Sequence, residues 1–315
     1  MSKVALICGI SGQDGTYLAK LLLGKGYKVY GTSRDAEGAS FSNLRSIAIF
    51  DQVTLLSMMP EDYRSVFSVM KKVEPDEVYF LAGQSSVVLS FEQPSETIQS
   101  SVIGTSNMLE ACRMLDKNIR FYQAGSGETF GGSKGLPANE ETSFNPLNPY
   151  AVGKVSAFWL VNYYRQAYKL FACTGILFNH ESPLRPERYV SQKIISTIKR
   201  IKAGSNEFLQ LGRMDISRDW GWAPEYVEAM WLMLQQTEPT DFVIATGKTY
   251  TLENFVETAF SQVDLDWKQF VKHSDEFLRP TDLIVSRADP SKAQEILKWE
   301  AKLDMPKVIH RMLNS

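Results

Sequence analysis

Val4-Ala-Leu-Ile-Cys8 is followed directly by Gly9-Ile-Ser-Gly12-Gln-Asp-Gly15, and Leu18, Leu21 and Leu22 continue at helical spacing. A short apolar run that ends in glycine is typical of a buried parallel strand. Glycines let backbone N–H groups come close to a phosphate, and the amino terminus of a helix favours negative charge. We therefore interpret this stretch as a cradle for a dinucleotide pyrophosphate rather than as an ordinary strand-to-helix turn.

The same alternation of strand and helix continues along the chain. Apolar runs predict further strands at 27–32, 53–56, 77–81, 120–124 and 172–178. Helical spacing predicts helices at 65–72, at 97–112 and from Lys154 to Tyr164. This rhythm predicts an α/β fold with a Rossmann-type, doubly wound parallel sheet whose site lies at the carboxyl ends of the strands.

The alternation breaks down after the strand predicted at 172–178. We expect residues 1–175 to form the dinucleotide-binding domain, with later sheet elements returning around 215–250. Residues 176–315 should form mainly a smaller, interleaved C-terminal lobe that binds the substrate. A helix is expected from about Val190.

Composition excludes several classes of protein. The chain has 315 residues, of which 44% are hydrophobic and 22% charged, with a net charge of -2. This charge gives no broad attraction to nucleic acid or anionic membrane, and no stretch reaches membrane-spanning length. Cys8, Cys112 and Cys173 lie far apart in apolar runs, which indicates reduced, buried thiols. The apolar run before Gly9 is too short for a signal peptide, so we expect a cytoplasmic protein without a metal site.

The end of the second predicted strand bears on the choice of cofactor. Proteins that prefer NAD place an acidic side chain there to hold the ribose 2′-hydroxyl. This chain has Thr32-Ser33-Arg34-Asp35, in which Ser33 and Arg34 suit a 2′-phosphate. NADP is therefore favoured over NAD, although Asp35 could neutralise Arg34. The alternative is that Arg34 is a solvated loop charge.

Four chemically active side chains follow the strand at 120–124. Ser126 and Glu128 come directly after it, and Tyr150 and Lys154 stand at i and i+4, on one face of the predicted helix. A lysine ammonium beside a phenol favours the phenolate, which makes tyrosine a usable base. The alternative for such a pair is a half-buried tyrosine and a solvated lysine.

Cationic side chains in the second half of the chain suit a diphosphate. We single out Lys193, Arg218 and Arg279; the alternative is that they are solvated surface charges. Without its sequence context, His180 would be interpreted as a structural histidine with satisfied hydrogen bonds.

Taken together, these motifs resemble the extended short-chain dehydrogenase/reductases and, among them, the GDP-mannose 4,6-dehydratase family. The resemblance covers nearly the whole chain. It rests on the segments 9–15, 75–79, 81–87, 123–131, 149–154, 175–183, 218–221, 229–236, 242–247 and 279–282. The glycine loop and the Tyr-x-x-x-Lys spacing are common to the superfamily, whereas Asn179–Pro183 and the segment that starts at Arg218 are far more specific.

The resemblance implies a role for each matching position. The catalytic residues are Ser126, Glu128, Tyr150 and Lys154. The cofactor-binding residues are Gly9, Ser11, Gly12, Gln13, Asp14, Gly15, Ser33, Arg34, Leu81, Ala82, Gln84, Lys154, His180 and Arg185. The substrate-binding residues are Ser85, Asn179, Val190, Lys193, Arg218, Arg279 and Asp282, the last standing where the family has a glutamate.

The resemblance also implies a reaction, the NADP-dependent dehydration of GDP-mannose to GDP-4-keto-6-deoxymannose in deoxysugar synthesis. Tyr150 would take the C4 hydroxyl proton, Ser126 would donate to the C4 oxygen, and Glu128 would remove the C5 proton so that water leaves from C6. A plain reductase needs no carboxylate at 128, whereas an elimination does, so we favour a lyase. The family also implies at least a homodimer, formed through two helices, or a homotetramer.

Some positions depart from the family pattern and leave alternatives open. Gly127 replaces a serine or aspartate, and Met58-Met59 replaces a Gly-Asp pair near the adenine. The loop after Arg34 lacks a second arginine, which puts a tetramer in doubt. The alternatives are a related GDP-sugar dehydratase, for example for a heptose, a GDP-4-keto-6-deoxyhexose reductase or epimerase, and a non-catalytic protein that binds NADP or a nucleotide sugar.

Overall fold

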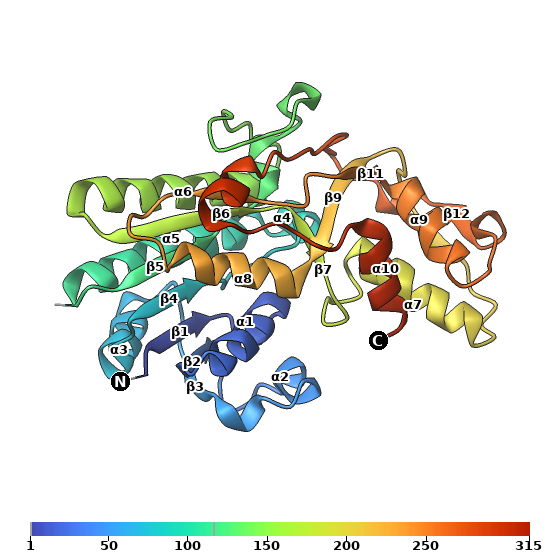
Figure 1. Ribbon diagram of the computed structural model, residues 1–315. Helices are drawn as coiled ribbons and strands as arrows, with labels where there is room; N and C mark the ends of the chain where they lie inside the picture. Colours follow the sequence, from blue (N-terminus) through green and yellow to red (C-terminus); the bar gives the residue numbers. More distant parts are fainter. Residues whose placement is uncertain (1, 116) are drawn as a thin grey trace.

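A parallel sheet of seven strands forms the centre of the computed structural model, which describes residues 2–115 and 117–315. Its strands are β1 (Val4–Cys8), β2 (Lys28–Ser33), β3 (Thr54–Ser57), β4 (Glu77–Phe80), β5 (Arg120–Ala124), β6 (Phe171–Leu177) and β10 (Phe242–Ile244). They run in the order β10-β6-β5-β4-β1-β2-β3 (Figure 1). The order reverses between β1 and β4, and the prediction of a doubly wound sheet is confirmed.

Helices cover both faces of this sheet. One layer contains α1 (Gln13–Gly24), α2 (Ser42–Ser46) and α8 (Ala223–Met233), and the other contains α3 (Tyr63–Val73), α4 (Val87–Glu92), α5 (Pro94–Met114) and α6 (Pro149–Tyr168). Leu18, Leu22 and Met230 belong to the core on the first face, and Leu109 and Val161 to the core on the second. Strands covered on both faces are mainly apolar, which is why the sequence predicts them.

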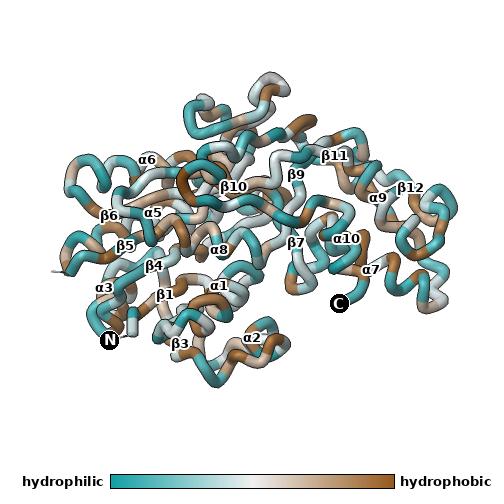
Figure 2. Tube along the Cα trace, viewed as in Figure 1, coloured by the Kyte–Doolittle hydropathy of each residue, from teal (hydrophilic) through white to brown (hydrophobic). Residues whose placement is uncertain are grey.

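A smaller lobe lies to one side of the sheet (Figure 1). It contains α7 (Val190–Lys202), α9 (Leu252–Ser261) and α10 (Met305–Leu313), the sheet of β7 (Asn179–Glu181), β9 (Ser217–Trp222) and β11 (Thr249–Thr251), and the pair of β8 (Leu209–Leu211) and β12 (Val271–His273). Its own core includes Ile194, Phe255 and Ile309. Figure 2 shows hydrophobic and hydrophilic residues interspersed along these helices, as expected where only one side is buried.

The chain passes between the two parts more than once. Of the segment expected to return to the sheet, β10 pairs with β6 and α8 packs against α1, whereas β9 pairs with β7 and β11. The two parts are therefore interleaved, and the domain boundary at residue 175 stays a prediction. Short single turns complete the fold at Phe50–Gln52, Gly127–Phe130, Ser133–Gly135, Trp267–Gln269, Asp275–Phe277 and Ala293–Leu297.

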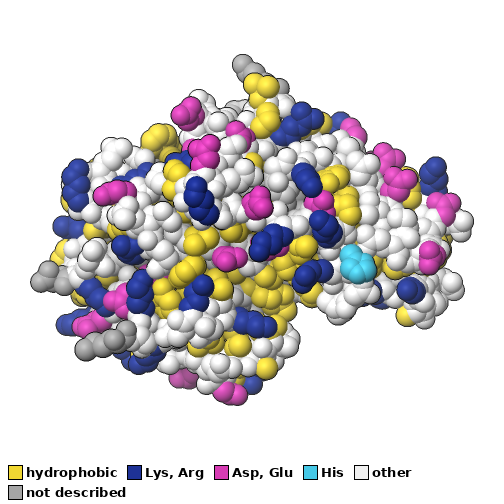
Figure 3. Space-filling view, viewed as in Figure 1, with side chains coloured by type: hydrophobic (Ala, Val, Ile, Leu, Met, Phe, Trp, Pro, Cys, Tyr) yellow, Lys and Arg dark blue, Asp and Glu magenta, His cyan; other side chains and the backbone are white. Residues whose placement is uncertain are grey.

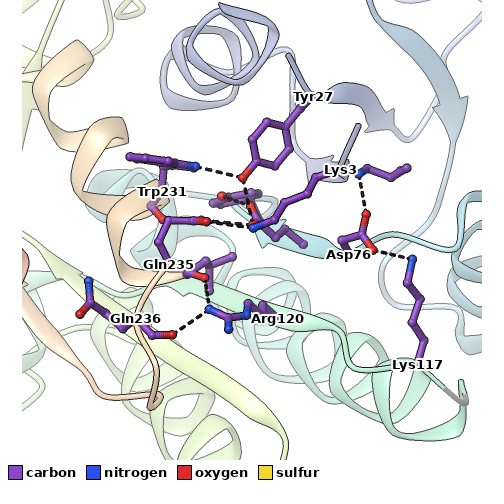
Figure 4. A network of polar contacts seen from close by, with 12 residues as sticks. Lys3, Tyr27, Asp76, Lys117, Arg120, Trp231, Gln235 and Gln236 are labelled. Atoms are coloured by element: carbon purple, nitrogen blue, oxygen red, sulfur yellow. Dashed lines mark hydrogen bonds and ion pairs between the residues drawn. The ribbon is translucent and has the colours of Figure 1, made fainter. Parts of the chain in front are cut away.

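The amino-terminal edge of the central sheet holds a buried carboxylate. Glu77, the first residue of β4, is 0% exposed. Its oxygens accept hydrogen bonds from Lys3 Nζ (2.9 Å), Tyr27 OH (3.1 Å), Tyr79 OH (2.8 Å) and Gln235 Nε2 (3.1 Å). Figure 4 shows Lys3, Tyr27 and Gln235 converging from three separate elements. The hydrogen bonds of Glu77 therefore join the starts of β1, β2 and β4 to the end of α8.

Further polar contacts extend along the same edge (Figure 4). Arg120 Nη1 donates to the carbonyls of Leu234 (2.6 Å) and Gln236 (2.8 Å), and Lys117 pairs with Asp76 at 2.8 Å. The chain that follows α8 is thereby tied to the start of β5.

The cysteines, the helices and the surface charges each bear on a prediction drawn from composition. Cys8, Cys112 and Cys173 are buried and unpaired, as predicted. Within residues 2–115 and 117–315, no helix combines the length and the apolar character needed to span a membrane. Figure 3 shows basic and acidic side chains interspersed over the face in view, which agrees with the small net charge.

Candidate functional site

The carboxyl ends of the central strands open into a cleft of about 520 Å³ that the smaller lobe borders on its other side. Most residues predicted for the site line this cleft: Gly9, Ser11, Gly12, Gln13, Asp14, Gly15, Ser33, Arg34, Leu81, Ala82, Ser85, Ser126, Glu128, Tyr150, Lys154, Asn179, His180, Arg185, Val190, Arg218 and Arg279. The exceptions are Gln84, Lys193 and Asp282.

The loop between β1 and α1 has the geometry of a phosphate cradle. Gly9 has φ +87°, and a Cβ there would lie 3.0 Å from the backbone nitrogen of Ala82. A Cβ on Gly15 would lie 2.4 Å from the Gly9 carbonyl oxygen, so neither position accepts a side chain. In the part of the chain that the structure describes, no side chain caps the amino terminus of α1 at Gly12, so its first N–H groups are available to an anion. The loop fits a dinucleotide pyrophosphate.

Asp14 in this loop is paired with His180 of β7. His180 Nε2 lies 2.8 Å from Asp14 Oδ2, and Nδ1 lies 2.7 Å from the Phe178 carbonyl oxygen. Both partners are acceptors, so the imidazole carries a proton on each nitrogen. Burial lowers the pKa of His180, but the charge of Asp14 outweighs it and the pKa is raised. Burial likewise raises the pKa of Asp14, but His180 reverses the shift and the pKa is lowered. The carboxylate is thereby neutralised beside the cradle.

The end of β2, where the sequence predicts the adenosine ribose, forms one end of the cleft. Ser33 and Arg34 line it, together with Met58, which is 1% exposed. Asp35 Oδ1 accepts hydrogen bonds from the backbone nitrogens of Glu37 (3.0 Å) and Gly38 (2.8 Å). Its carboxylate is therefore engaged within its own turn. A pairing with Arg34, which the sequence left open, is absent from the ion pairs that the structure describes.

Ser126 and Glu128 follow β5 on a single 3-10 turn. The Ser126 hydroxyl caps this turn by accepting from the Glu128 backbone nitrogen at 3.3 Å. Asn148 caps α6 by accepting from the Ala151 nitrogen at 2.8 Å, and its Nδ2 donates to Glu128 Oε2 at 3.2 Å. Asn148 was not predicted as a site residue. Asn-Pro is a helix-start signal in the sequence, but its contact with Glu128 depends on the fold.

Tyr150 and Lys154 lie on the first turns of α6, and each is 8% exposed. The Lys154 ammonium donates to the Ala124 carbonyl at 2.7 Å and lies 5.7 Å from the centre of the Tyr150 ring. Burial lowers the pKa of Lys154 to about 8. The alternative of a solvated lysine is therefore wrong.

Lys154 is not among the groups that shift the pKa of Tyr150 in this structure, so the stabilisation of the phenolate by this lysine stays a prediction. Burial raises the pKa of Tyr150, and a hydrogen bond with Ser126 opposes the shift without reversing it. The physical reason is that the phenol is shielded from water while the nearest described partner of the ammonium is the Ala124 oxygen.

Gly127 has a steric explanation. A Cβ at this position would lie 2.9 Å from Cε2 and 3.0 Å from Cζ of Phe178. Phe178 is 3% exposed, and its ring stacks on Phe130 with centroids 6.3 Å apart. The ring of Phe178 therefore occupies the space in which a side chain at 127 would begin.

Two arginines reach the cleft from the smaller lobe. Arg218 is 4% exposed, donates to the Leu283 carbonyl at 2.6 Å, and lies 3.3 Å from Asp282. Arg279 lies 3.7 Å from the same carboxylate. Burial lowers the pKa of Arg218, although Glu128 and Asp282 oppose it. Asp282 therefore does not line the cleft; its carboxylate pairs with both arginines and helps to hold them in place.

The other two exceptions have partners elsewhere. Gln84 Nε2 donates to Thr97 Oγ1 at 3.1 Å, which ties the loop after β4 to α5. Lys193 Nζ donates to the Gln210 carbonyl at 2.7 Å and lies 3.4 Å from the ring centre of Phe277. The structure therefore does not bring these side chains into the cleft, and their predicted ligand roles stay predictions. The residues that the structure describes contain no group of three or more His, Cys, Asp or Glu that could hold a metal ion.

Comparison with known proteins identifies the family. The family model described as GDP-mannose 4,6 dehydratase matches residues 6–312. The chain belongs to this family. GDP-mannose 4,6 dehydratase 2 of Arabidopsis thaliana is 42% identical over 322 residues, covering 99% of this chain and 86% of the relative. Membership makes the protein an enzyme of the hydro-lyase class.

Solved structures agree with the fold of this family member. The dTDP-glucose 4,6-dehydratase DesIV of Streptomyces venezuelae, solved with NAD, superposes with a TM-score of 0.87 at 17% identity, covering 99% of this chain and 96% of the other. RMD of Pseudomonas aeruginosa, complexed with NADPH, gives 0.80 at 21% identity, with 99% and 98% covered. At these identities the likeness concerns the fold alone.

Proposed function

We propose that this chain dehydrates GDP-mannose to GDP-4-keto-6-deoxymannose with NADP as its cofactor. The observation that carries the proposal is the meeting of Ser126, Glu128 and Tyr150 in a cleft that also contains the glycine loop and Arg218. Relatives in the family bear the name of this reaction. A carboxylate at 128, held by Asn148, is what an elimination requires beyond a simple reduction.

Each residue has one task in the proposed reaction. A nicotinamide dinucleotide held by the glycine loop of Gly9, Gly12 and Gly15 would supply the hydride chemistry, removal from C4 of the hexose and return at C6. Tyr150 accepts the C4 hydroxyl proton as its phenolate, which the ammonium of Lys154, 5.7 Å from the ring centre, would stabilise, and Ser126 donates to the C4 oxygen. The C4 carbonyl acidifies C5, so Glu128 removes the C5 proton and passes it to the departing C6 hydroxyl, which leaves as water. The proton that is then added at C5 is balanced by the one that Tyr150 took from the C4 hydroxyl, so Tyr150 and Glu128 end in their starting states.

The adenosine end supports NADP over NAD in this proposal. Ser33 and Arg34 suit the 2′-phosphate, and Asp35 is engaged in its own turn. Replacing Arg34 with Ala should weaken NADP binding about 30-fold and leave NAD binding within about two-fold, because a guanidinium–phosphate bond contributes about 2 kcal/mol. Calorimetric titration of both dinucleotides tests this. Equal losses for the two cofactors would contradict the NADP assignment.

We also propose a homodimer formed through α5 and α6, which pack side by side. Apolar side chains exposed on these helices support it: Ile103, Met114, Val152, Trp159 and Tyr163. A tetramer stays a second expectation. Light scattering of the protein and of a Trp159→Glu variant would test the dimer.

The three unpaired cysteines support our proposal of a reducing compartment, the cytoplasm.

The deciding experiment is incubation of the purified protein with GDP-mannose and NADP, followed by mass spectrometry. We expect a product lighter by one water without net change in the cofactor. Net consumption of NADPH with a 4-keto-6-deoxy substrate would instead indicate a reductase, and turnover of GDP-heptose alone would indicate the related dehydratase. The control is Glu128→Gln, which should permit C4 oxidation but stall the elimination. Dehydration at the parent rate by this variant would contradict the role of Glu128.

A further inference from the structure

Two hydroxyl groups from different parts of the molecule meet across the cleft. Ser85 lies in the loop after β4, and Tyr189 directly precedes α7 in the smaller lobe. Their hydroxyl oxygens are 2.8 Å apart, and both residues line the cleft. Tyr189 has no role in the reaction proposed above, and sequence patterns did not single it out.

The ring of Tyr189 is held in place by cations. The guanidinium of Arg185 lies 4.1 Å from the ring centre and that of Arg188 lies 5.2 Å away. Arg185 is itself anchored, because it lies 2.9 Å from Glu181 and donates to the His180 carbonyl at 3.2 Å. A fixed ring presents its hydroxyl at a defined point, so little ordering is required when a ligand binds there.

This point is close to the reacting groups. Tyr189 and Ser85 line the same cleft as Tyr150, Ser126 and Glu128. Arg218 and Arg279 supply the cations suited to a diphosphate in the same cleft. If the diphosphate lies against these arginines and the reacting carbon against Tyr150, the hexose lies within reach of Tyr189 and Ser85.

We propose that Tyr189 and Ser85 form a hexose-reading pair, which exchanges its mutual hydrogen bond for bonds to hydroxyl groups of the sugar. Each hydroxyl can both donate and accept, as can the hydroxyls of a hexose, so the exchange conserves hydrogen bonds. The proposal rests on the proposed function and deepens it, because it assigns Tyr189 to the discrimination between sugars. A sugar without a matching hydroxyl would leave one member of the pair without a partner, which is how polar sites discriminate.

The exchange leaves a specific signature in a double-mutant cycle. A single variant, Tyr189→Phe or Ser85→Ala, loses one hydrogen bond to the hexose. It has no bond between residues 85 and 189 to break on binding, so part of the lost affinity is recovered. The double variant loses both hexose bonds. From typical net hydrogen-bond energies we expect a loss of GDP-mannose affinity of about 4-fold in each single variant and about 50-fold in the double variant, more than the product of the single losses.

The measurement is calorimetric titration of the protein loaded with NADP, in a Tyr150→Phe background so that GDP-mannose is not consumed. GDP, which lacks the hexose, serves as the second ligand, and its affinity should stay within about two-fold in every variant. The matched control is Tyr168→Phe, which removes the hydroxyl of an exposed tyrosine at the carboxyl end of α6 and should change neither affinity. Tyr189→Phe keeps the ring between its cations, and its melting temperature shows whether folding is intact.

The outcomes separate this inference from the function on which it rests. Equal losses for GDP and GDP-mannose, or tighter binding of GDP-mannose by the single variants, would overturn the hexose-reading pair; the second result would mean that the bond only bars the cleft. Unchanged GDP-mannose affinity in the double variant would do the same while leaving the proposed function intact. Failure of the parent protein to bind either ligand would overturn both proposals.

Discussion

The central sheet has an amino-terminal edge, where its parallel strands begin, and a carboxyl-terminal edge, where they end. Both edges bury ionisable side chains, but the hydrogen-bond partners of these side chains differ. At the amino-terminal edge, Glu77 is completely buried and accepts hydrogen bonds from four side chains of the protein itself. At the carboxyl-terminal edge, in the described part of the chain, the Lys154 ammonium donates to one carbonyl oxygen and retains two further N–H groups next to the cleft. Tyr150 shares this edge and is similarly buried.

The difference separates stability from chemistry within one sheet. A buried charge whose hydrogen bonds are satisfied within the protein holds elements together, whereas buried groups with capacity to spare cost stability until a ligand completes them. The depressed pKa of Lys154, about 8, is a measure of that cost. Substitutions at the two edges should therefore have opposite signatures.

The largest effect is expected from Tyr150→Phe at the carboxyl edge. Loss of the base should lower turnover of GDP-mannose about 1000-fold, while the free energy of unfolding should not fall, because a buried hydroxyl is replaced by hydrogen. Product formation by mass spectrometry and chemical denaturation are the measurements. A variant that keeps more than a tenth of the parent turnover would remove Tyr150 from the mechanism.

At the amino edge, Glu77→Gln should show the reverse. An amide cannot accept all four hydrogen bonds and leaves Lys3 without its counter-charge, so we expect a loss of about 2 kcal/mol in unfolding free energy with kcat unchanged. The control is Glu110→Gln, which breaks a partly exposed ion pair with Arg113 and should cost less than about 1 kcal/mol. Equal destabilisation by the two variants would end the distinction between the edges.

A smaller effect should follow from Gly127→Ser beside the reacting groups. The new side chain collides with Phe178, so overpacking should cost about 1.5 kcal/mol in the free energy of unfolding. In a Phe178→Leu background the same substitution should cost less, because the ring atoms that it meets are gone. Denaturation of the four proteins of this cycle measures the coupling. An unchanged cost in the leucine background would show that Phe178 does not exclude the side chain.

The smallest effect concerns the pair that links the glycine loop to β7. The pKa of His180 is raised above its ordinary value of 6.5, so its stabilisation is complete below that pH and is lost as the pH rises through the raised pKa. The pKa of Asp14 is lowered below 3.8, so the pair weakens again only in stronger acid. Arg185, Lys154 and the Tyr226 ring also face this pair.

The corresponding variant is His180→Gln. Its stability relative to the parent should be lowest between about pH 4 and pH 6.5, by about 1 kcal/mol, and should recover at alkaline pH. Denaturation at several pH values measures this difference, with the exposed His273→Gln as the control. If the difference in unfolding free energy between the parent and His180→Gln grew as the pH rose, His180 could not be the charged partner of Asp14.

Local rules explain what the sequence revealed about the fold and the site. The spacing of Gly9, Gly12 and Gly15 after an apolar strand and the helical spacing of Tyr150 and Lys154 are properties of short segments, and both predictions of local structure are confirmed. The seven-stranded sheet follows from the repetition of such segments.

Contacts between distant segments explain what the sequence did not reveal. The bond from Asn148 to Glu128, the ring of Phe178 over Gly127 and the approach of Tyr189 to Ser85 exist only in the folded chain. Lys193 lies on α7, the helix predicted to start near Val190, but its ammonium donates to the Gln210 carbonyl and does not enter the cleft. Spacing specifies a face of a helix, whereas neighbouring elements decide what a side chain on that face contacts.

The late return of β10 to the sheet has a consequence for biosynthesis. β6 pairs with β5 on one side and with β10 on the other, so its second edge stays open until Phe242–Ile244 has left the ribosome. An apolar strand with unpaired backbone groups is a template for association with another chain. Nascent chains that end between β6 and β10 should therefore be the aggregation-prone stage of synthesis and the stage most in need of chaperones.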